Sequence, residues 1–442
     1  MFDSFKRKIF LLVIIAAIVM PSYSSASSKH KVQKAAQSSP KSILDLLPFT
    51  DPAFRFQCLW RFGNIAGGGG DFAEMMTAAR DVVDCKHESW YLPWATLADN
   101  TAKIASEYLR SGHLVSAQAA FFRATNYYRA AEIYVTPGDP LGEATWKKGR
   151  DCFLKAAALS KGLIKFVEIP FEGTVLPAYW CRVDDSGKKR PLLIIQTGLD
   201  GTAEDLYFIV APYALKRGYN CLIFEGPGQG EVIRIKKIPF RHNWETVVTP
   251  VLNYALSLPE VTEAKIALIG YSMAGYLVPR AMAFEHRIRY CVVDSGVLSV
   301  FDGLMTKFAP EVKTYVDSDS AEKKVNRMIA GEQKKRSDID QFITQMLWTF
   351  GADSPFNLFR KLKTFNVKDC MDRIDCEMLV IGSVNDQVAG SFEQAKLFFA
   401  ALKSPKTYLE FSDAEGAQFH CQIGAPMNSS EKILNWVDER LK

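Results

Sequence analysis

The pattern of apolar residues changes near residue 166. Before that point, small and aromatic residues recur every three or four positions without strand-like alternation, as between Ala119 and Ala131. This spacing predicts packed helices, which we place at Phe72–Val83, Trp94–Ser111, Leu114–Ile133 and Thr145–Gly162. We interpret their aromatic residues as core and not as a ligand-stacking surface. Residues 51–165 are therefore predicted to form an N-terminal helical domain.

After residue 166, short continuous apolar runs alternate with helical segments. The runs predict buried strands at Leu192–Gln196, Asn220–Phe224, Lys265–Ile269, Tyr290–Asp294, Glu377–Ile381 and Thr407–Phe411. Continuous apolar strands separated by helices are typical of a mostly parallel sheet covered on both faces. We therefore predict an α/β domain over residues 166–442. The largely helical stretch at residues 297–370 is predicted to be a lid insertion above the carboxyl ends of the strands, where such sheets bind ligands.

The N-terminal segment has a third pattern. Lys6-Arg7-Lys8 precede an apolar run from Ile9 to Met20, and a Ser24-x-Ala26 exit follows. These features predict a secretory signal peptide over residues 1–26. The apolar run is shorter than the roughly 20 residues of a membrane span, although an uncleaved membrane anchor stays an open alternative. Residues 27–50 are predicted to be a linker, and the protein is expected to be periplasmic or secreted.

Composition limits the classes of protein to consider. The chain has 442 residues, of which 48% are hydrophobic and 23% charged, so two or three domains with an ample core are expected. A net charge of +5 gives no reason to expect nucleic-acid binding. The nine cysteines include no C-x-x-C pair, so neither a zinc site nor a thioredoxin-type redox centre is predicted. Disulfides between Cys58 and Cys85 and between Cys370 and Cys376 are conceivable after export.

The strongest chemical signal lies just after the predicted strand Lys265–Ile269. The run Gly270-Tyr271-Ser272-Met273-Ala274-Gly275 continues from this strand into a helical pattern. A strand, a tight turn with one central serine, and a helix make up the nucleophile elbow of α/β-hydrolases. The small residues around the serine suit a turn that has no room for larger side chains. Ser272 is therefore the predicted nucleophile.

A serine nucleophile needs a general base and an acid that orients the base, and in this fold the chain order is serine, acid, histidine. Among the six histidines, only His420 follows the last predicted strand, so it is the predicted base. Asp386 stands just past the strand Glu377–Ile381 and is the predicted acid. Asp294, at the end of an earlier strand, is the alternative acid.

Two backbone N–H groups are expected to hold the negative oxygen of the transition state. One is the amide of Met273, and the other is the amide of Leu199, where Gly198 allows a close approach of the backbone. Asp200 is unexpected there, because a carboxylate opposes a developing negative charge. Its side chain either points to solvent or contacts a polar or cationic group of the substrate and takes part in proton transfer.

A second glycine-rich run, Gly226-Pro227-Gly228-Gln229-Gly230, follows the predicted strand Asn220–Phe224. It lacks the G-x-G-x-x-G spacing of a dinucleotide-binding loop, and Pro227 does not suit a phosphate cradle. We interpret it as a tight structural turn that borders the substrate pocket.

Several motifs together resemble one group of α/β-hydrolases, which includes dihydroxypseudooxynicotine hydrolase, fungal polyketide-shortening hydrolases and the fermentation–respiration switch esterases. The resemblance runs from about Trp90 to His420 and is carried by the elbow and by Ile169–Thr174, Leu176–Tyr179, Gly198–Glu204 and Phe224–Glu231. It implies a serine hydrolase, with carbon–carbon cleavage in several members, and it implies a role in catalysis for Asp200. The chain departs from the group in having Ala274 for a glycine and Glu225 for an aspartate.

The resulting hypothesis is a serine hydrolase that needs no metal or organic cofactor. Its substrate is expected to be a small acyl compound, cleaved at an ester or at a carbon–carbon bond next to a ketone. A peptidase is a weaker alternative, because the N-terminal region is predicted to be helical and not a β-propeller. A catalytically silent binding or effector protein is the other alternative. The helical domain could also provide a homodimer surface, and contact with a membrane is expected only through an uncleaved N-terminal segment.

Overall fold

The structure is a computed structural model that describes residues 43–442. The signal peptide predicted at residues 1–26 and most of the linker predicted at residues 27–50 lie outside the described residues, so both stay predictions. Within residues 43–442, none of the helices combines the length and the apolar character needed to cross a membrane.

An eight-stranded sheet forms the centre of the fold, in the order β1-β2-β4-β3-β5-β6-β7-β8. The pairs β1–β2 and β2–β4 are antiparallel and all other pairs are parallel. This topology confirms the predicted α/β fold. The strands are β1 (Ile164–Phe171), β2 (Thr174–Cys181), β3 (Leu192–Gln196), β4 (Asn220–Phe224), β5 (Ile266–Tyr271), β6 (Tyr290–Asp294), β7 (Glu377–Ser383) and β8 (Lys406–Phe411).

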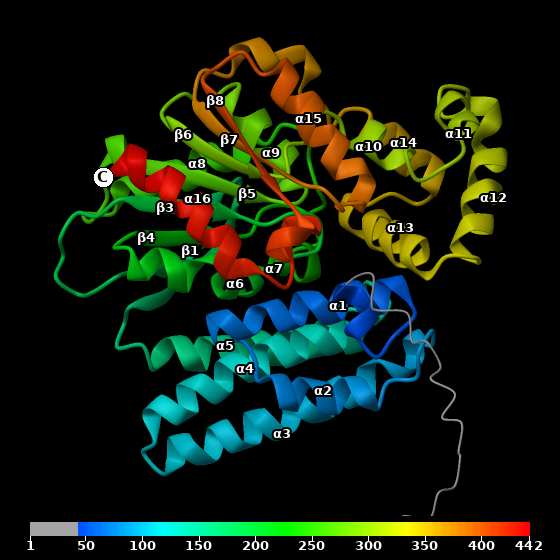
Figure 1. Ribbon diagram of the computed structural model, residues 1–442. Helices are drawn as coiled ribbons and strands as arrows, with labels where there is room; N and C mark the ends of the chain where they lie inside the picture. The colour runs from blue at the N-terminus through cyan, green and yellow to red at the C-terminus, as the bar shows by residue number, and fades with distance from the viewer. Residues whose placement is uncertain (1–42) are drawn as a thin grey trace, which may run out of the picture. The chain divides into compact units, whose positions relative to one another are not determined.

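Helices cover both faces of the sheet (Figure 1). Successive residues of a strand point to opposite faces, so Leu192 and Ile194 of β3 enter one core cluster while Leu193 and Ile195 enter the other. The first cluster is completed by α8 (Glu245–Ser257), α9 (Ala274–Met282) and α15 (Ser391–Ala401). The second is completed by α6 (Ala203–Lys216) and α16 (Pro426–Leu441). Burial on both faces explains the continuous apolar runs of the central strands.

Five helices precede the sheet and share a core that includes Phe54, Trp90, Trp94 and Tyr127. They are α1 (Pro52–Gly63), α2 (Phe72–Arg80), α3 (Tyr91–Arg110), α4 (Leu114–Glu132) and α5 (Pro140–Ala158). Four of them were predicted, whereas α1 was not. Helix α1 buries Gln57 and Arg61 as well as apolar side chains, so apolar spacing alone does not mark its buried face.

The helices α1–α5 lie against the sheet region through buried ion pairs. Arg61 Nη1 of α1 lies 2.6 Å from Asp205 Oδ1 of α6, and Arg129 Nε of α4 lies 3.1 Å from Asp205 Oδ2. All three side chains are buried. Residues 43–442 accordingly belong to one compact unit, and the predicted boundary between domains at residues 165 and 166 stays a prediction.

A helical insertion connects β6 to β7, within the stretch predicted to be a lid. Its helices are α10 (Val300–Met305), α11 (Pro310–Tyr315), α12 (Glu322–Gln333), α13 (Ser337–Phe350) and α14 (Pro355–Leu362). The Ser337 hydroxyl donates a hydrogen bond to Asp51 Oδ2, the N-cap of α1, at 2.7 Å. The insertion is therefore in direct contact with the N-terminal helices.

The cysteines form no disulfide within the described residues. All nine are free thiols, and all but Cys85 are buried. The conceivable bridges between Cys58 and Cys85 and between Cys370 and Cys376 are therefore absent from this structure.

Candidate active site

Ser272 occupies a strained turn between β5 and α9. Its backbone φ is +59°, a left-handed value that non-glycine residues rarely adopt. The turn is tightly packed and leaves no room for a side chain at Gly275, because a Cβ there would lie only 1.6 Å from the carbonyl oxygen of Ser295. This is the backbone expected of a nucleophile elbow, and Ala274 fits into it at the position where the related group has glycine.

The structure brings Ser272, His420 and Asp386 into one hydrogen-bonded chain. His420 Nε2 lies 2.8 Å from Ser272 Oγ, and His420 Nδ1 lies 2.8 Å from Asp386 Oδ2. Asp386 follows β7, and its other carboxylate oxygen accepts a hydrogen bond of 3.0 Å from the backbone N–H of Val388. His420 and Asp386 are both buried, whereas Ser272 is half-buried. Three segments far apart in the sequence thus meet at the carboxyl edge of the sheet.

The alternative acid, Asp294, makes no hydrogen bond to His420 in the described part of the chain. Its Oδ1 accepts a hydrogen bond of 3.0 Å from Gln422 Nε2, and its Oδ2 has no hydrogen-bond partner in the described part of the chain. The Asp294 carbonyl accepts the backbone N–H of Ser272 at 2.5 Å. Asp294 therefore supports the elbow through its backbone, while Asp386 contacts the imidazole.

Burial and nearby charges shift the pKa values of His420 and Asp294. Burial alone would lower the pKa of His420, but the Asp386 carboxylate raises that pKa well above its usual value. Burial raises the pKa of Asp294 to about 7, with a smaller contribution from the charge of Asp386. A buried carboxyl with an unpartnered oxygen favours its neutral form.

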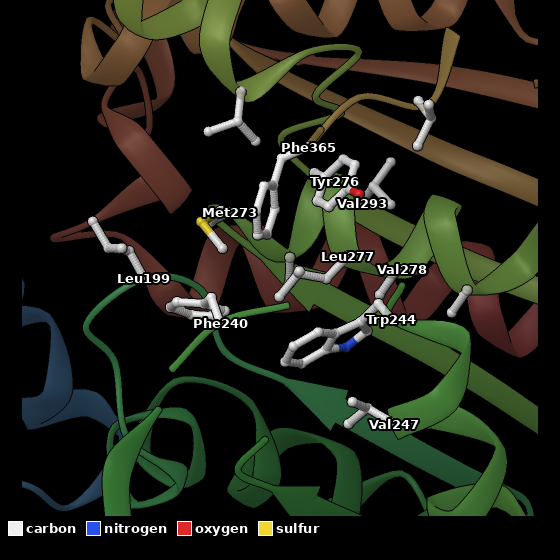
Figure 2. Close-up of a cluster of buried hydrophobic side chains, with 14 of the residues drawn as sticks. Leu199, Phe240, Trp244, Val247, Met273, Tyr276, Leu277, Val278, Val293 and Phe365 are labelled. Atoms are coloured by element: carbon white, nitrogen blue, oxygen red, sulfur yellow. The ribbon is translucent and has the colours of Figure 1, made fainter. Parts of the chain in front are cut away.

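The predicted oxyanion donors flank the serine. A Cβ at Gly198 would lie 2.7 Å from the Met273 nitrogen and 2.7 Å from Ser272 Cβ, so only glycine allows this approach of the loop to the elbow. Leu199 and Met273 are buried, and neither backbone N–H has an acceptor among residues 43–442. Figure 2 shows their side chains in the apolar cluster that also contains Phe240. Buried N–H groups without an acceptor are rare in proteins and are what an oxyanion needs.

Asp200 is half-buried at the end of the same loop. Its carbonyl accepts a hydrogen bond of 2.7 Å from Arg129 Nη2 of α4. Its carboxylate has no hydrogen-bond partner in the described part of the chain, and it is one of the charges, after Glu132 and Asp205, that raise the pKa of the buried Arg129 guanidinium against the effect of burial. The Asp200 carboxylate thus interacts with the Arg129 and Arg61 charges without a direct hydrogen bond to either side chain.

Sequence reasoning missed residues that surround the site. The Phe56 ring of α1 has its centroid 6.3 Å from that of His420, at an interplanar angle of 35°. Arg129 contacts the Asp200 carbonyl, and Gln229 contacts the loop before it. Gln229 lies in the run interpreted as a structural turn, so its place after a strand was the one available signal. Nothing in the sequence links Phe56 or Arg129 to the serine.

Glu225, where the related group has aspartate, holds backbone groups and contacts no triad residue. It accepts hydrogen bonds from the N–H groups of Ala203 at 3.0 Å and Glu231 at 2.8 Å, beside the Arg150 guanidinium. Burial raises its pKa to about 7, and the charge of Glu204 adds to this effect. Its position therefore supports the start of α6 and the turn after β4.

Comparison with known proteins finds relatives that match most of the chain. The chain is 29% identical over 409 residues to 20-hydroxy-prefusarin hydrolase FUS2 of Gibberella moniliformis, covering 88% of this chain and 97% of the relative. Hydrolase LUC6 of a Fusarium species is 29% identical over 410 residues, with the same coverage.

Among solved structures, 2,6-dihydroxy-pseudo-oxynicotine hydrolase matches with a TM-score of 0.67 at 18% identity, covering 86% of this chain and 95% of that one. AbyA5 matches with a TM-score of 0.55 at 16% identity, covering 83% and 88%. These likenesses support the α/β-hydrolase fold. The sequence profile of the FrsA-like esterases matches residues 77–318, more than half of the chain, and the protein belongs to this family.

Proposed function

We propose that this hydrolase is serine-dependent, with Ser272 as nucleophile, His420 as general base and Asp386 as the acid that orients the imidazole. The observation that carries the proposal is the continuous chain from Ser272 Oγ through both ring nitrogens of His420 to Asp386, with both contacts at 2.8 Å. Because a serine hydroxyl is a weak nucleophile, it needs a base within hydrogen-bond reach. The chain of contacts supplies one.

The reaction begins when Ser272 Oγ attacks a substrate carbonyl and passes its proton to His420 Nε2. The carbonyl oxygen becomes negative, and the N–H groups of Leu199 and Met273 stabilise it. His420 then gives the proton to the leaving group, and water hydrolyses the acyl-enzyme by the same steps. No step requires a metal ion or an organic cofactor.

The leaving group decides between the two reactions that this site supports. In an ester it is an alkoxide, and in carbon–carbon cleavage next to a ketone it is an enolate that takes the proton at carbon or oxygen. We propose a small acyl compound as substrate. The names of two related proteins, 20-hydroxy-prefusarin hydrolase and 2,6-dihydroxy-pseudo-oxynicotine hydrolase, refer to hydroxylated compounds, which favours polar groups on that substrate. We propose that the unpartnered Asp200 carboxylate contacts a polar or cationic group of that compound.

Labelling with a fluorophosphonate probe tests the proposal, because this probe reacts with activated serines. We expect a stoichiometric adduct on Ser272 in the wild type and none in Ser272→Ala. Ser186→Ala, which changes an exposed serine between β2 and β3, is the matched control and should label like the wild type. An unlabelled wild type would favour a silent binding protein instead.

A substrate panel then separates the reactions. Aryl esters, 1,3-diketones and aminoacyl amides are each offered to the wild type and to Ser272→Ala. We expect Ser272-dependent turnover of esters or diketones. Turnover of the amides alone would contradict the proposed reaction class and favour a peptidase.

A further inference from the structure

The loop that contains Leu199 is held by a side chain from another segment. Gln229 lies in the turn between β4 and α7 (Gly230–Arg234) and is fully buried. Its Nε2 donates to the carbonyl of Thr197 at 2.6 Å and to the carbonyl of Gly198 at 2.9 Å. Gln229 therefore contacts the two peptide groups immediately before Leu199.

The hydrogen-bond network determines which way the Gln229 amide points. Its Oε1 accepts from the backbone N–H of Gly226 at 2.8 Å and from Gln196 Nε2 at 3.1 Å. A backbone N–H can only donate, so Oε1 must face Gly226. The amide nitrogen is then left to face the two carbonyls of the loop.

The hydrogen bond from Gln229 to the Gly198 carbonyl also determines the direction of the Leu199 N–H. The Gly198 carbonyl and the Leu199 N–H belong to one planar peptide group, which is trans, because Asp294–Ser295 is the one cis bond recorded in the described chain. In a trans peptide the C=O and N–H point in opposite directions. A bond that draws the Gly198 oxygen toward Gln229 therefore turns the Leu199 N–H away from Gln229. On the serine side of the loop, Gly198 packs against Ser272 and Met273.

We propose that Gln229 is a positioning residue that keeps the Leu199 N–H directed at the oxygen held above Ser272. The inference rests on the proposed function and adds to it the group that orients one oxyanion donor. Without Gln229, the Gly198–Leu199 peptide can rotate, which removes a donor and presents a carbonyl oxygen to the negative charge. Arg129, through the Asp200 carbonyl, holds the far end of the same loop.

The main test compares Gln229→Met with Gln196→Met. Both glutamines are fully buried and belong to the same network, but Gln196 contacts Gln229 and Trp244 and neither loop carbonyl. Loss of one oxyanion donor lowers kcat by about 10²-fold or more. We expect a loss of this size for Gln229→Met, with KM within about threefold, and a similar loss in the rate of fluorophosphonate labelling. The fold-loss in kcat for Gln196→Met should be less than about a tenth of that for Gln229→Met. The two variants should have similar melting temperatures.

Gln229→Glu provides a second test, the pH dependence of kcat, which would not change if Gln229 had a purely structural role. The introduced carboxyl keeps an oxygen for Gly226 and Gln196, but when ionised it offers no donor to the loop carbonyls. When protonated it can donate to one of them. We therefore expect the ratio of variant to wild-type kcat to rise as the pH is lowered, and the same ratio for Gln196→Met to stay flat.

The outcomes separate the two proposals. Dependence of wild-type labelling on Ser272 reports on the proposed function alone. Wild-type kcat in either Gln229 variant, an equal loss in Gln196→Met, or a flat pH ratio for Gln229→Glu would overturn the role of Gln229 and leave the nucleophile in place.

Discussion

At the scale of single residues, the sequence identified some contacts of the site and could not identify others. The sequence singled out Ser272 from its turn and His420 from its place after the last strand, and the structure brings the two into contact. The sequence favoured Asp386 as the acid over Asp294, although both lie at strand ends on the same edge of the sheet. Which carboxylate faces the imidazole depends on how the loop after β7 folds, and no local pattern encodes that. The partners of Gln229 are equally non-local.

Asp386→Asn tests the acid. The carboxylate raises the pKa of His420 above its usual 6.5, and the base works only when neutral, so wild-type kcat/KM should rise with pH through that raised pKa. Removing the charge should move this acidic limb to lower pH and lower kcat by about 10⁴-fold, because the imidazole loses its correct tautomer. A pH–rate profile measures both effects. Asp375→Asn, an exposed carboxyl paired with His286, should leave the limb in place, and an unmoved limb in Asp386→Asn would contradict the assignment.

Asp294→Asn tests the second buried carboxyl. Its pKa is raised from 3.8 to about 7 in the folded protein, so the folded chain keeps this proton in a pH range where the unfolded chain has lost it. The protonated Asp294 carboxyl therefore contributes its full stabilisation below pH 3.8, the pKa of the unfolded chain. This stabilisation is lost as the pH rises toward 7, the pKa in the folded protein. The variant cannot ionise, so the difference in free energy of unfolding between variant and wild type should shift in favour of the variant by about 3 kcal/mol from pH 4 to pH 7. Urea unfolding at several pH values measures this, with exposed Asp369→Asn as control. An advantage that is constant with pH would contradict the shifted pKa.

Whole helices and strands were predictable where one physical signal dominated. The central strands are buried on both faces and therefore read as continuous apolar runs. Strand β1 mixes exposed and buried positions and, with β2, went unassigned. Helix α1 was missed because it buries polar side chains, among them Arg61, whose guanidinium contacts Asn126 of α4 and Asp205 of α6. Elements stabilised by long-range polar contacts leave little trace in the local sequence.

Two glycines in helices should respond oppositely to alanine. Gly275 in α9 would place its Cβ 1.6 Å from a backbone oxygen, whereas a Cβ at Gly331 in α12 would meet no atom within 4 Å. We expect Gly275→Ala to destabilise the fold by several kcal/mol and to disrupt the elbow, since backbone cannot move aside cheaply. Gly331→Ala should stabilise by about 0.5–1 kcal/mol, because alanine favours helix. Thermal unfolding measures both, and equal effects would contradict the packing of α9 against Ser295.

At the scale of the whole molecule, buried charges connect the N-terminal helices to the sheet region. Asp205 is shared by Arg61 and Arg129, and Arg129 also pairs with Glu132 at 2.9 Å. Burial raises the pKa of Asp205, but the two guanidiniums lower it below its usual value overall. A single carboxylate therefore stabilises the contact between three helices that the sequence places far apart.

Asp205→Asn should break this connection. Removing one member of a buried ion pair leaves an uncompensated charge and costs about 3–5 kcal/mol. Asp151→Asn, which removes an exposed pair with Lys147, should change stability by less than about 1 kcal/mol. Urea unfolding followed by tryptophan fluorescence measures both. A loss below 1 kcal/mol in Asp205→Asn would show that this carboxylate does not hold the helices to the sheet region.

Helix α1 places the Phe56 ring beside His420, and Asp51 at its N-cap accepts a hydrogen bond from Ser337 in the insertion between β6 and β7. The surroundings of His420 are thus built in part from sequence outside the segments that contain Ser272, Asp386 and His420. Family members could diverge in α1 and change which molecules fit, while the chemistry of bond cleavage stays the same. Exchanging residues 52–63 between relatives would be a direct way to redirect substrate preference.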